Sequence, residues 1–243
     1  MTDAFQPLHL EMLLPHEIRA MLGRRPVVYV PLGTIEWHSE HLPVGLDALT
    51  AHGICLRAAA EDGGLVCPPL YYGTGGSHGS YPFTIMMDDE AAISALLQKS
   101  LQRFEVFGVR LVVLFSGHFA PLQLTMIADV AAAWNATPSP LRILSLGVNM
   151  VEGASLAPDH AGVFETTLLH ALWPDRVDIG QLPALAGDPD QGGDPYGKQR
   201  HDPGHALFGI FGPDPRSFDV TKGVELLQKT VDWLVMRVRS IEV

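Results

Sequence analysis

Four short apolar runs recur along the chain, and stretches with helical spacing separate them. The runs cover residues 27–32, 65–72, 111–115 and 141–148. Residues 111–115 and 141–144 are nearly continuous in apolar character, which is typical of central parallel strands buried on both faces. The helical spacing predicts helices over 47–60, 89–106, 121–134, 164–173 and 220–238. We therefore expect one domain across residues 1–243, an α/β fold of three layers (α/β/α) with a mostly parallel central sheet.

Residues 183–215 break this pattern. They are rich in Gly, Pro and Asp and have no sustained period, which predicts a long irregular connection that acts as a lid, contacts another subunit or is mobile. His201 and His205 lie in this segment. Loop histidines are more often solvated than functional, although a lid that reaches a site could use one of them.

Composition narrows the class of partner. The chain has 243 residues, 47% of them hydrophobic, which is enough for a large core. A net charge of -11 argues against nucleic acid or an anionic membrane, since both require a basic face. No apolar run reaches the ~18 residues of a membrane span, and the first residues lack the pattern of a secretion signal. Two cysteines are too few for a disulfide framework, so we expect a cytoplasmic protein with a small-molecule substrate.

Potential metal ligands gather directly after the first apolar run. Glu36, His38 and Asp47 lie within one short segment beyond Gly33. In an extended loop, residues i and i+2 share one side about 7 Å apart, so Glu36 and His38 could each bind one of two neighbouring metals, with Asp47 as the bridging carboxylate. The order His38-Ser39-Glu40-His41 ahead of Pro43 does not match the helical His-Glu-x-x-His motif of zinc proteases.

Three more polar groups follow apolar runs in the same way. They contain His78 within the glycine-rich stretch 73–82, His118 after Ser116-Gly117, and His160 with Glu165 in the stretch 159–167. The loops at the carboxyl ends of parallel strands meet at one edge of a sheet, so these groups should converge there. The glycine-rich stretch lacks the spacing of a phosphate-binding loop, and a tight turn with positive φ at glycine explains it better.

These motifs together resemble the creatininase family. Gly33-x-x-Glu36-x-His38-x-x-His41-Leu42-Pro43-x-x-x-Asp47 is close to the first motif of that family, which is long and specific. Ser116-Gly117-His118 is similar to its Asn-Gly-His motif, and His160-Ala161-Gly162-x-x-Glu165-Thr166 is similar to its His-Ala-Gly-x-x-Glu-Thr motif. A glycine-rich segment at 209–215 also resembles one that precedes the last helix in the family. The likeness extends over most of the chain and implies the creatininase-like version of the predicted fold.

The resemblance implies a centre with two divalent metal ions, usually zinc, manganese or iron. The ligands carried over by motif are Glu36, Asp47 and His118 for the first ion, and His38 and Asp47 for the second. In creatininase a glutamate two residues after the Asn-Gly-His histidine completes the second set, and this chain has Ala120 there. Glu165 is our candidate for the missing ligand.

The resemblance further implies a metal-dependent amidohydrolase, in which activated water attacks a cyclic amide or formamide-like C–N bond. His160 would carry the proton to the leaving nitrogen, and we assign it with Glu165 as catalytic. His41, His78 and Trp37 are predicted substrate contacts, although the two histidines could equally be structural. The family also suggests a homo-oligomer such as a hexamer.

Several departures from the family pattern lie around the pocket. Ser116 replaces Asn, the residues Phe119-Ala120-Pro121 replace the usual polar continuation, and residues 154–158 lack the tryptophan of creatininase. Creatinine is therefore not the expected substrate. Two alternatives stay open: hydrolysis of another small carbonyl compound, such as ring opening of a cyclic polyol diketone, and a metal-binding family member without catalysis.

Overall fold

A parallel sheet of four strands forms the centre of the protein. The computed structural model describes residues 8–185 and 194–242. The strands are β1 (Val27–Leu32), β2 (Leu65–Val66), β3 (Leu111–Ser116) and β4 (Arg142–Gly147), and their order in the sheet is β2-β1-β3-β4. Val28 of β1 aligns with Val112 of β3, which in turn aligns with Ile143 of β4. All carboxyl ends therefore open at one edge of the sheet.

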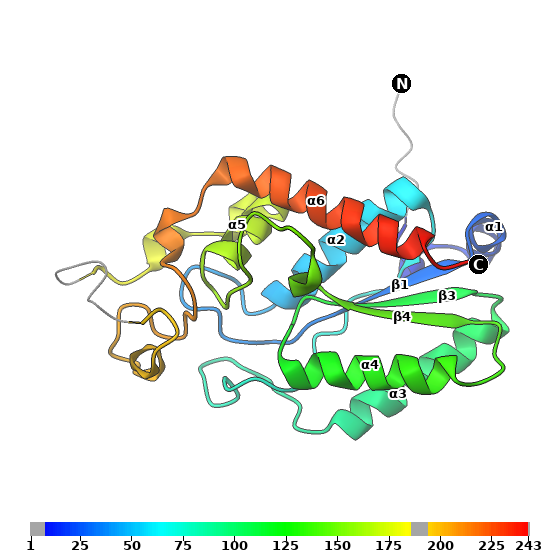
Figure 1. Ribbon diagram of the computed structural model, residues 1–243, viewed down its shortest axis with the longest axis horizontal. Helices are drawn as coiled ribbons and strands as arrows, with labels where there is room; N and C mark the ends of the chain where they lie inside the picture. The colour runs from blue at the N-terminus through cyan, green and yellow to red at the C-terminus, as the bar shows by residue number, and fades with distance from the viewer. Residues whose placement is uncertain (1–7, 186–193, 243) are drawn as a thin grey trace.

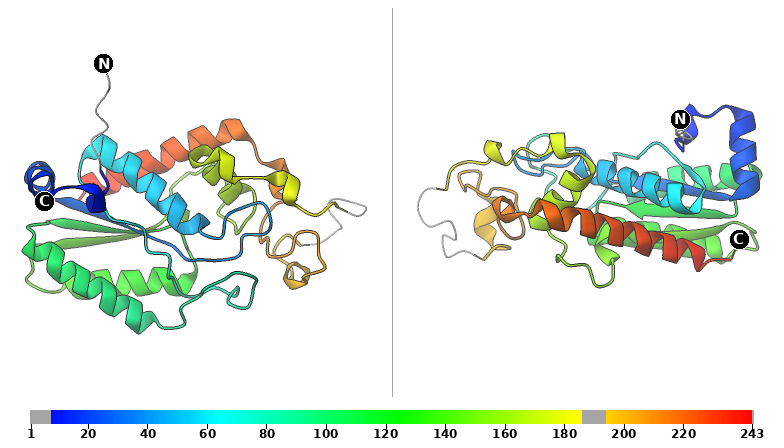
Figure 2. Two further views of the ribbon diagram at one scale, coloured as in Figure 1. Left: turned by 180° about the vertical axis from the view of Figure 1, so that it is seen from behind. Right: turned by 90° about the horizontal axis from the view of Figure 1, so that it is seen from above.

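Helices cover both faces of this sheet, as Figures 1 and 2 show. One face packs against α2 (Leu46–Asp62), α5 (Val163–Leu172) and α6 (Val220–Arg239). The other face packs against α3 (Glu90–Val106) and α4 (Pro121–Asn135), with α1 (Pro15–Arg24) at its margin. The predicted three-layer α/β fold with a parallel sheet is confirmed.

One local prediction was wrong, and one helix was missed. The strand expected over 65–72 is only Leu65–Val66, because Pro68 and Pro69 have no N–H to donate to the sheet. Cys67 and Leu70 on either side still donate to the main chain of β1, so the segment stays extended. The helix α1 was not predicted, although Ile18, Met21 and Leu22 have helical spacing and pack, partly buried, against the core on this face.

The segment 183–215 is irregular, as expected, apart from the short 3-10 helices Lys198–His201 and Pro215–Ser217; residues 186–193 lie outside the described part. In the described residues, every helix is too short or too polar to span a bilayer.

Candidate metal centre

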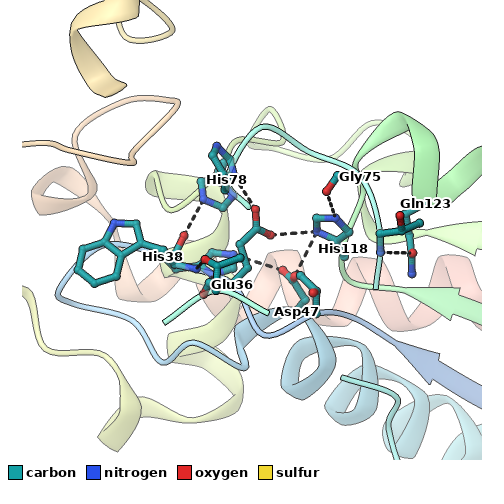
Figure 3. A network of polar contacts seen from close by, with 12 residues as sticks. Glu36, His38, Asp47, Gly75, His78, His118 and Gln123 are labelled. Carbon is teal, nitrogen blue, oxygen red and sulfur yellow. Dashed lines mark hydrogen bonds and ion pairs between the residues drawn. The ribbon is translucent and has the colours of Figure 1, made fainter. Parts of the chain in front are cut away.

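Five acidic and histidine side chains from four parts of the chain meet at the carboxyl edge of the sheet. Figure 3 labels Glu36, His38, Asp47 and His118 among them. Glu36 and His38 lie in the segment that follows β1, and His118 lies two residues after β3. Asp47 and Glu165 each occupy the first turn of a helix, α2 and α5 respectively. All five side chains are buried. The convergence expected from the sequence is therefore present.

Two glycines allow the first turn of α2 to approach the strand ends. A Cβ added at Gly33 would overlap the main chain of Ala48, and a Cβ added at Gly117 would overlap the carbonyl oxygen of Asp47. Any larger residue would push α2 outward. The two glycines, one from each motif, thus bring Asp47 between the ends of β1 and β3.

The ligand atoms form two groups that share Asp47. In the first, Nδ1 of His118 lies 3.1 Å from Oε2 of Glu36 and 3.2 Å from Oδ2 of Asp47. In the second, Nε2 of His38 lies 3.3 Å from Oδ1 of Asp47 and 3.5 Å from Oε2 of Glu165. The ligand atoms within each group lie within 4.8 Å of one another. Asp47 directs one oxygen into each group, which is the geometry of a bridging carboxylate.

Main-chain carbonyls orient both histidines of these groups. Nδ1 of His38 lies 2.9 Å from the carbonyl oxygen of Glu36, so this nitrogen carries hydrogen and donates it. Nε2 of His118 lies 3.3 Å from the carbonyl oxygen of Gly75 and donates in the same way. In each ring the other nitrogen faces the carboxylates. Metal-binding histidines typically donate their second N–H to such a partner.

The residues present fit a pair of divalent cations. Oε2 of Glu36, Nε2 of His38 and Oδ2 of Asp47 are buried, and among the described residues they make no hydrogen bond. Buried polar atoms of this kind are rare in proteins unless an ion or another partner satisfies them. Carboxylate oxygens with two imidazoles suit zinc, manganese or iron, and the centre offers no thiolate because both free cysteines lie elsewhere in the core.

The pKa shifts of the buried groups indicate that the centre stabilises positive charge. Burial lowers the pKa of His38, but the charges of Asp47 and Glu165 outweigh this and raise it to about 10. Burial raises the pKa of Asp47, but the positive charge of His38 and the neighbouring His118 bring it down to about 2. Burial raises the pKa of Glu165 well above its ordinary value. Cations placed between these carboxylates would therefore be stabilised in the same way.

A strained turn before α5 aims Glu165 at the centre. Asp159 accepts hydrogen bonds from the main-chain N–H of Gly162, Phe164 and Glu165, which caps the helix. Ala161 has φ of 55°, a rare conformation for a residue with a side chain, and its N–H donates to Oε2 of Glu165 at 2.6 Å. A Cβ at position 162 would collide with Asp159. The His-Ala-Gly-x-x-Glu spacing therefore has a structural cause.

His160 and His78 form one wall of the centre. Nε2 of His160 lies 3.0 Å from the carbonyl oxygen of Trp37, and its ring stacks on His78 with 4.1 Å between centroids. His78 in turn donates from Nδ1 to Oε1 of Glu36 and stacks on Phe211. Burial and the positive charge of His38 lower the pKa of His160 to about 3. His160 is therefore a neutral ring held by a main-chain carbonyl.

A cavity of about 270 Å³ opens onto these groups. Its lining includes Glu36, Asp47, His78, His118, His160 and Glu165, together with Ser77, Phe119, Ala120, Pro121 and Phe211. The structure thus brings His78 to the cavity. The ring of His41 instead bonds to Thr166 behind the centre, and the indole of Trp37 packs between Phe83 and Phe208. Substrate contact by His41, His78 and Trp37 stays a prediction.

Comparison with known proteins gives the family. The creatininase family profile, described as "Creatinine amidohydrolase", matches residues 11–238. The creatinine amidohydrolase of Pseudomonas putida is 30% identical over 181 residues, which cover 64% of this chain and 68% of that protein. The chain belongs to the creatininase family.

Other creatininase-family relatives have different names. A mycofactocin precursor peptide peptidase of Mycolicibacterium smegmatis is 29% identical over 65% of this chain. A 3-dehydro-scyllo-inosose hydrolase of Thermotoga maritima is 24% identical over 73% of this chain. The matched regions span 62% and 56% of those two proteins. All three relatives are named as hydrolases, so the chain is a hydrolase of this family.

Solved structures share the creatininase fold. A crystal structure of creatinine amidohydrolase (creatininase) superposes with a TM-score of 0.77 at 22% identity and covers 97% of this chain and 98% of that one. Solved creatininases include a manganese form and a zinc–zinc form of a mutant. Metal binding in this family agrees with the two candidate ligand groups that share Asp47.

Some residues of the creatininase-family site were not found from the sequence. The carbonyl groups of Gly75 and Trp37 orient His118 and His160, and main-chain groups have no signature of their own in a sequence. Gln123 beside His118 was read only as part of a helix, and Phe211 only as part of a glycine-rich segment. Nothing in the sequence separates Gln123 from other polar residues of a helix, because its burial is seen only in the structure.

Proposed function

We propose that this hydrolase acts through two divalent metal ions. Glu36, Asp47 and His118 would hold one ion, and His38, Asp47 and Glu165 would hold the other. The observation that carries the proposal is the convergence of buried ligand atoms without hydrogen bonds on a shared carboxylate. When bound, a pair of divalent cations lowers the pKa of water and polarises a substrate carbonyl.

His160 is the proton carrier in this proposal. Its Nε2–H donates to the carbonyl of Trp37, so Nδ1 is the nitrogen that can accept a proton. The lowered pKa leaves the ring neutral near pH 7, which is the protonation state that a general base requires. His160 takes the proton of the attacking water and delivers it to the leaving nitrogen as the C–N bond breaks. The Trp37 carbonyl keeps the ring in place during both transfers.

The reaction we propose is hydrolysis of a cyclic amide or formamide-like C–N bond in a small molecule. Two of the named relatives, the creatinine amidohydrolase and the peptide peptidase, have names that denote hydrolysis of C–N bonds. Among the described residues, neither lysine nor arginine lines the cavity of about 270 Å³, and Phe119, Pro121 and Phe211 give it apolar walls. A compact substrate without a free carboxylate suits this pocket.

A second candidate is hydrolysis of a cyclic polyol ketone. The inosose hydrolase from Thermotoga maritima supports it, since activated water can attack a ring carbonyl as well as an amide. The metal-loaded protein should be tested on a panel of lactams, cyclic ureas, formamides and polyol ketones, with release of ammonia or amine as the readout. Nitrogen release supports the first candidate, and ring opening of a ketone without it favours the second. A protein that binds two metals but hydrolyses nothing in a broad panel would contradict both.

A further inference from the structure

We propose that Gln123 is a positioning residue that sets the metal affinity of the first ligand group. It does so by fixing the glycine-rich loop whose carbonyl orients His118. The inference rests on the metal centre proposed above, and it concerns a residue outside every motif of the sequence. Figure 3 shows Gln123 beside His118 and Gly75.

Gln123 links the two segments that meet at His118. Its side chain is 1% exposed and lies in the first turn of α4. Oε1 of Gln123 accepts a hydrogen bond from the main-chain N–H of Thr74 at 3.1 Å. Nε2 points toward Oγ of Ser116 at 3.5 Å, and that hydroxyl donates to the carbonyl oxygen of His118 at 2.5 Å. The side-chain amide of Gln123 therefore connects the glycine-rich loop, through Thr74, to the end of β3, through Ser116.

The loop beyond Thr74 depends on the hydrogen bond to Gln123, because two of its glycines have positive φ angles. Gly75 and Gly76 have φ of +82° and +92°, and a Cβ at Gly75 would lie 2.7 Å from Cβ of Leu122. The pair of left-handed residues turns the Gly75 carbonyl toward Nε2 of His118. The N–H of Thr74 is buried, so without Gln123 it would lose its partner, and the turn would shift to find another.

The position of this carbonyl decides which nitrogen of His118 meets the metal. With Nε2–H directed to Gly75, Nδ1 faces Glu36 and Asp47 at 3.1 and 3.2 Å. If the Gly75 carbonyl moves, the His118 ring is free to rotate, and its Nδ1 is no longer held facing the carboxylates of Glu36 and Asp47. Partners that orient metal-binding histidines are typically worth about 10- to 100-fold in metal affinity.

The test compares the full-length wild type with Gln123→Met, which keeps the size of the side chain but removes its hydrogen bonds. Gln123→Asn, whose amide is too short to reach Thr74, is measured in parallel in case the Met variant folds poorly. Asn135→Leu is the control, since Asn135 on the same helix makes two hydrogen bonds to the main chain of Ile143 far from the centre. The readouts are stepwise zinc affinities by chelator competition, and the ring ¹⁵N–¹H NMR signal of His118 in the zinc-loaded protein.

We expect one of the two zinc affinities to fall at least about tenfold in both Gln123 variants and to stay unchanged in Asn135→Leu. We also expect hydrogen exchange at Nε2–H of His118 to accelerate in Gln123→Met and Gln123→Asn but not in Asn135→Leu. Gln123→Glu, which keeps an acceptor for the N–H of Thr74, should keep the wild-type signal. Two unchanged zinc affinities in folded Gln123 variants would overturn the inference while leaving the metal centre intact. If the wild type itself binds no zinc or manganese, the proposed function fails instead.

Discussion

Oε2 of Glu165 lies 3.5 Å from Nε2 of His38, so a helix late in the chain supplies an oxygen to the segment that follows the first strand. This contact depends on the turn in which Ala161 donates to Glu165 and Asp159 caps α5. It gives the second ligand group a carboxylate in a protein that has Ala120 where creatininase has glutamate. The proposed centre is thus complete with a different ligand set.

Replacement of His160 should remove the proton carrier and spare the metals. In His160→Gln the side-chain amide can still donate to the carbonyl of Trp37, but it cannot accept and deliver a proton. We expect kcat to fall by about 10²- to 10⁴-fold on whichever substrate the panel identifies, with metal content unchanged. The measurements are steady-state kinetics and metal analysis on one preparation. Activity equal to the wild type would exclude His160 as proton carrier.

The close approach of α2 to the strand ends makes Gly117 sensitive to the smallest substitution. In Gly117→Ala the new Cβ would overlap the carbonyl of Asp47, so either α2 or the His118 segment must move. We expect a loss of about 3 kcal/mol or more in the free energy of unfolding, measured with urea. Gly23→Ala is the matched control, because nothing lies within 4 Å of that Cβ and alanine favours helix α1 by roughly 0.5–1 kcal/mol. Equal stability of the two variants would contradict the account.

Stability should fall on acidification partly because of His41. Burial and the positive charges of His38 and Arg216 lower its pKa from 6.5 to about 3, so below pH 6.5 the unfolded chain binds a proton that the folded protein does not. The free energy of unfolding therefore decreases as the pH falls from 6.5 toward 3, by at most ~1.4 kcal/mol per pH unit from this residue. In chelator-treated protein, His41→Gln should show a shallower slope between pH 6.5 and 5.

Thr166→Val is the control for His41, since it removes the hydrogen bond to the ring but keeps the titrating group. This variant should be less stable than the wild type at every pH and should keep the wild-type slope. If the slope of His41→Gln matches that of the wild type, then His41 does not take up a proton on unfolding.

The strands and the converging loops were predictable because each leaves a local pattern. The residues of β1 and β3 are buried throughout, and a continuous apolar run has no other common explanation at that length. The candidate ligands Glu36, His38 and Asp47 stood out because they lie so close together in the sequence. The convergence of their loops followed from the parallel sheet, which places all carboxyl ends at one edge.

Most of the features that were not predicted depend on contacts that are visible only in the folded structure. The early end of β2 could have been read from Pro68 and Pro69, which cannot donate to the sheet although the apolar character continues past them. The carbonyls of Gly75 and Trp37 act through main-chain groups that every residue possesses. Gln123 looks like any polar residue of a helix until its burial and its bond to Thr74 are seen.

A double substitution tests whether Glu165 supplies the metal ligand that creatininase has at the position of Ala120. Ala120 and Glu165 both line the cavity, so a carboxylate at either position could complete the second ligand group. We expect Glu165→Gln to lose metal, and the double variant Ala120→Glu with Glu165→Gln to regain part of it. The measurement is metal stoichiometry after exhaustive dialysis. A double variant that binds no more metal than Glu165→Gln would show that position 120 cannot supply the ligand.

The metal content of purified wild type and Glu165→Ala tests the central claim most directly. After loading with zinc or manganese and removal of free metal, the account predicts near two ions per wild-type chain and near one per Glu165→Ala chain, because the first group of Glu36, Asp47 and His118 stays complete. Wild-type protein without bound metal, or a Glu165→Ala variant that still holds two ions, would contradict it.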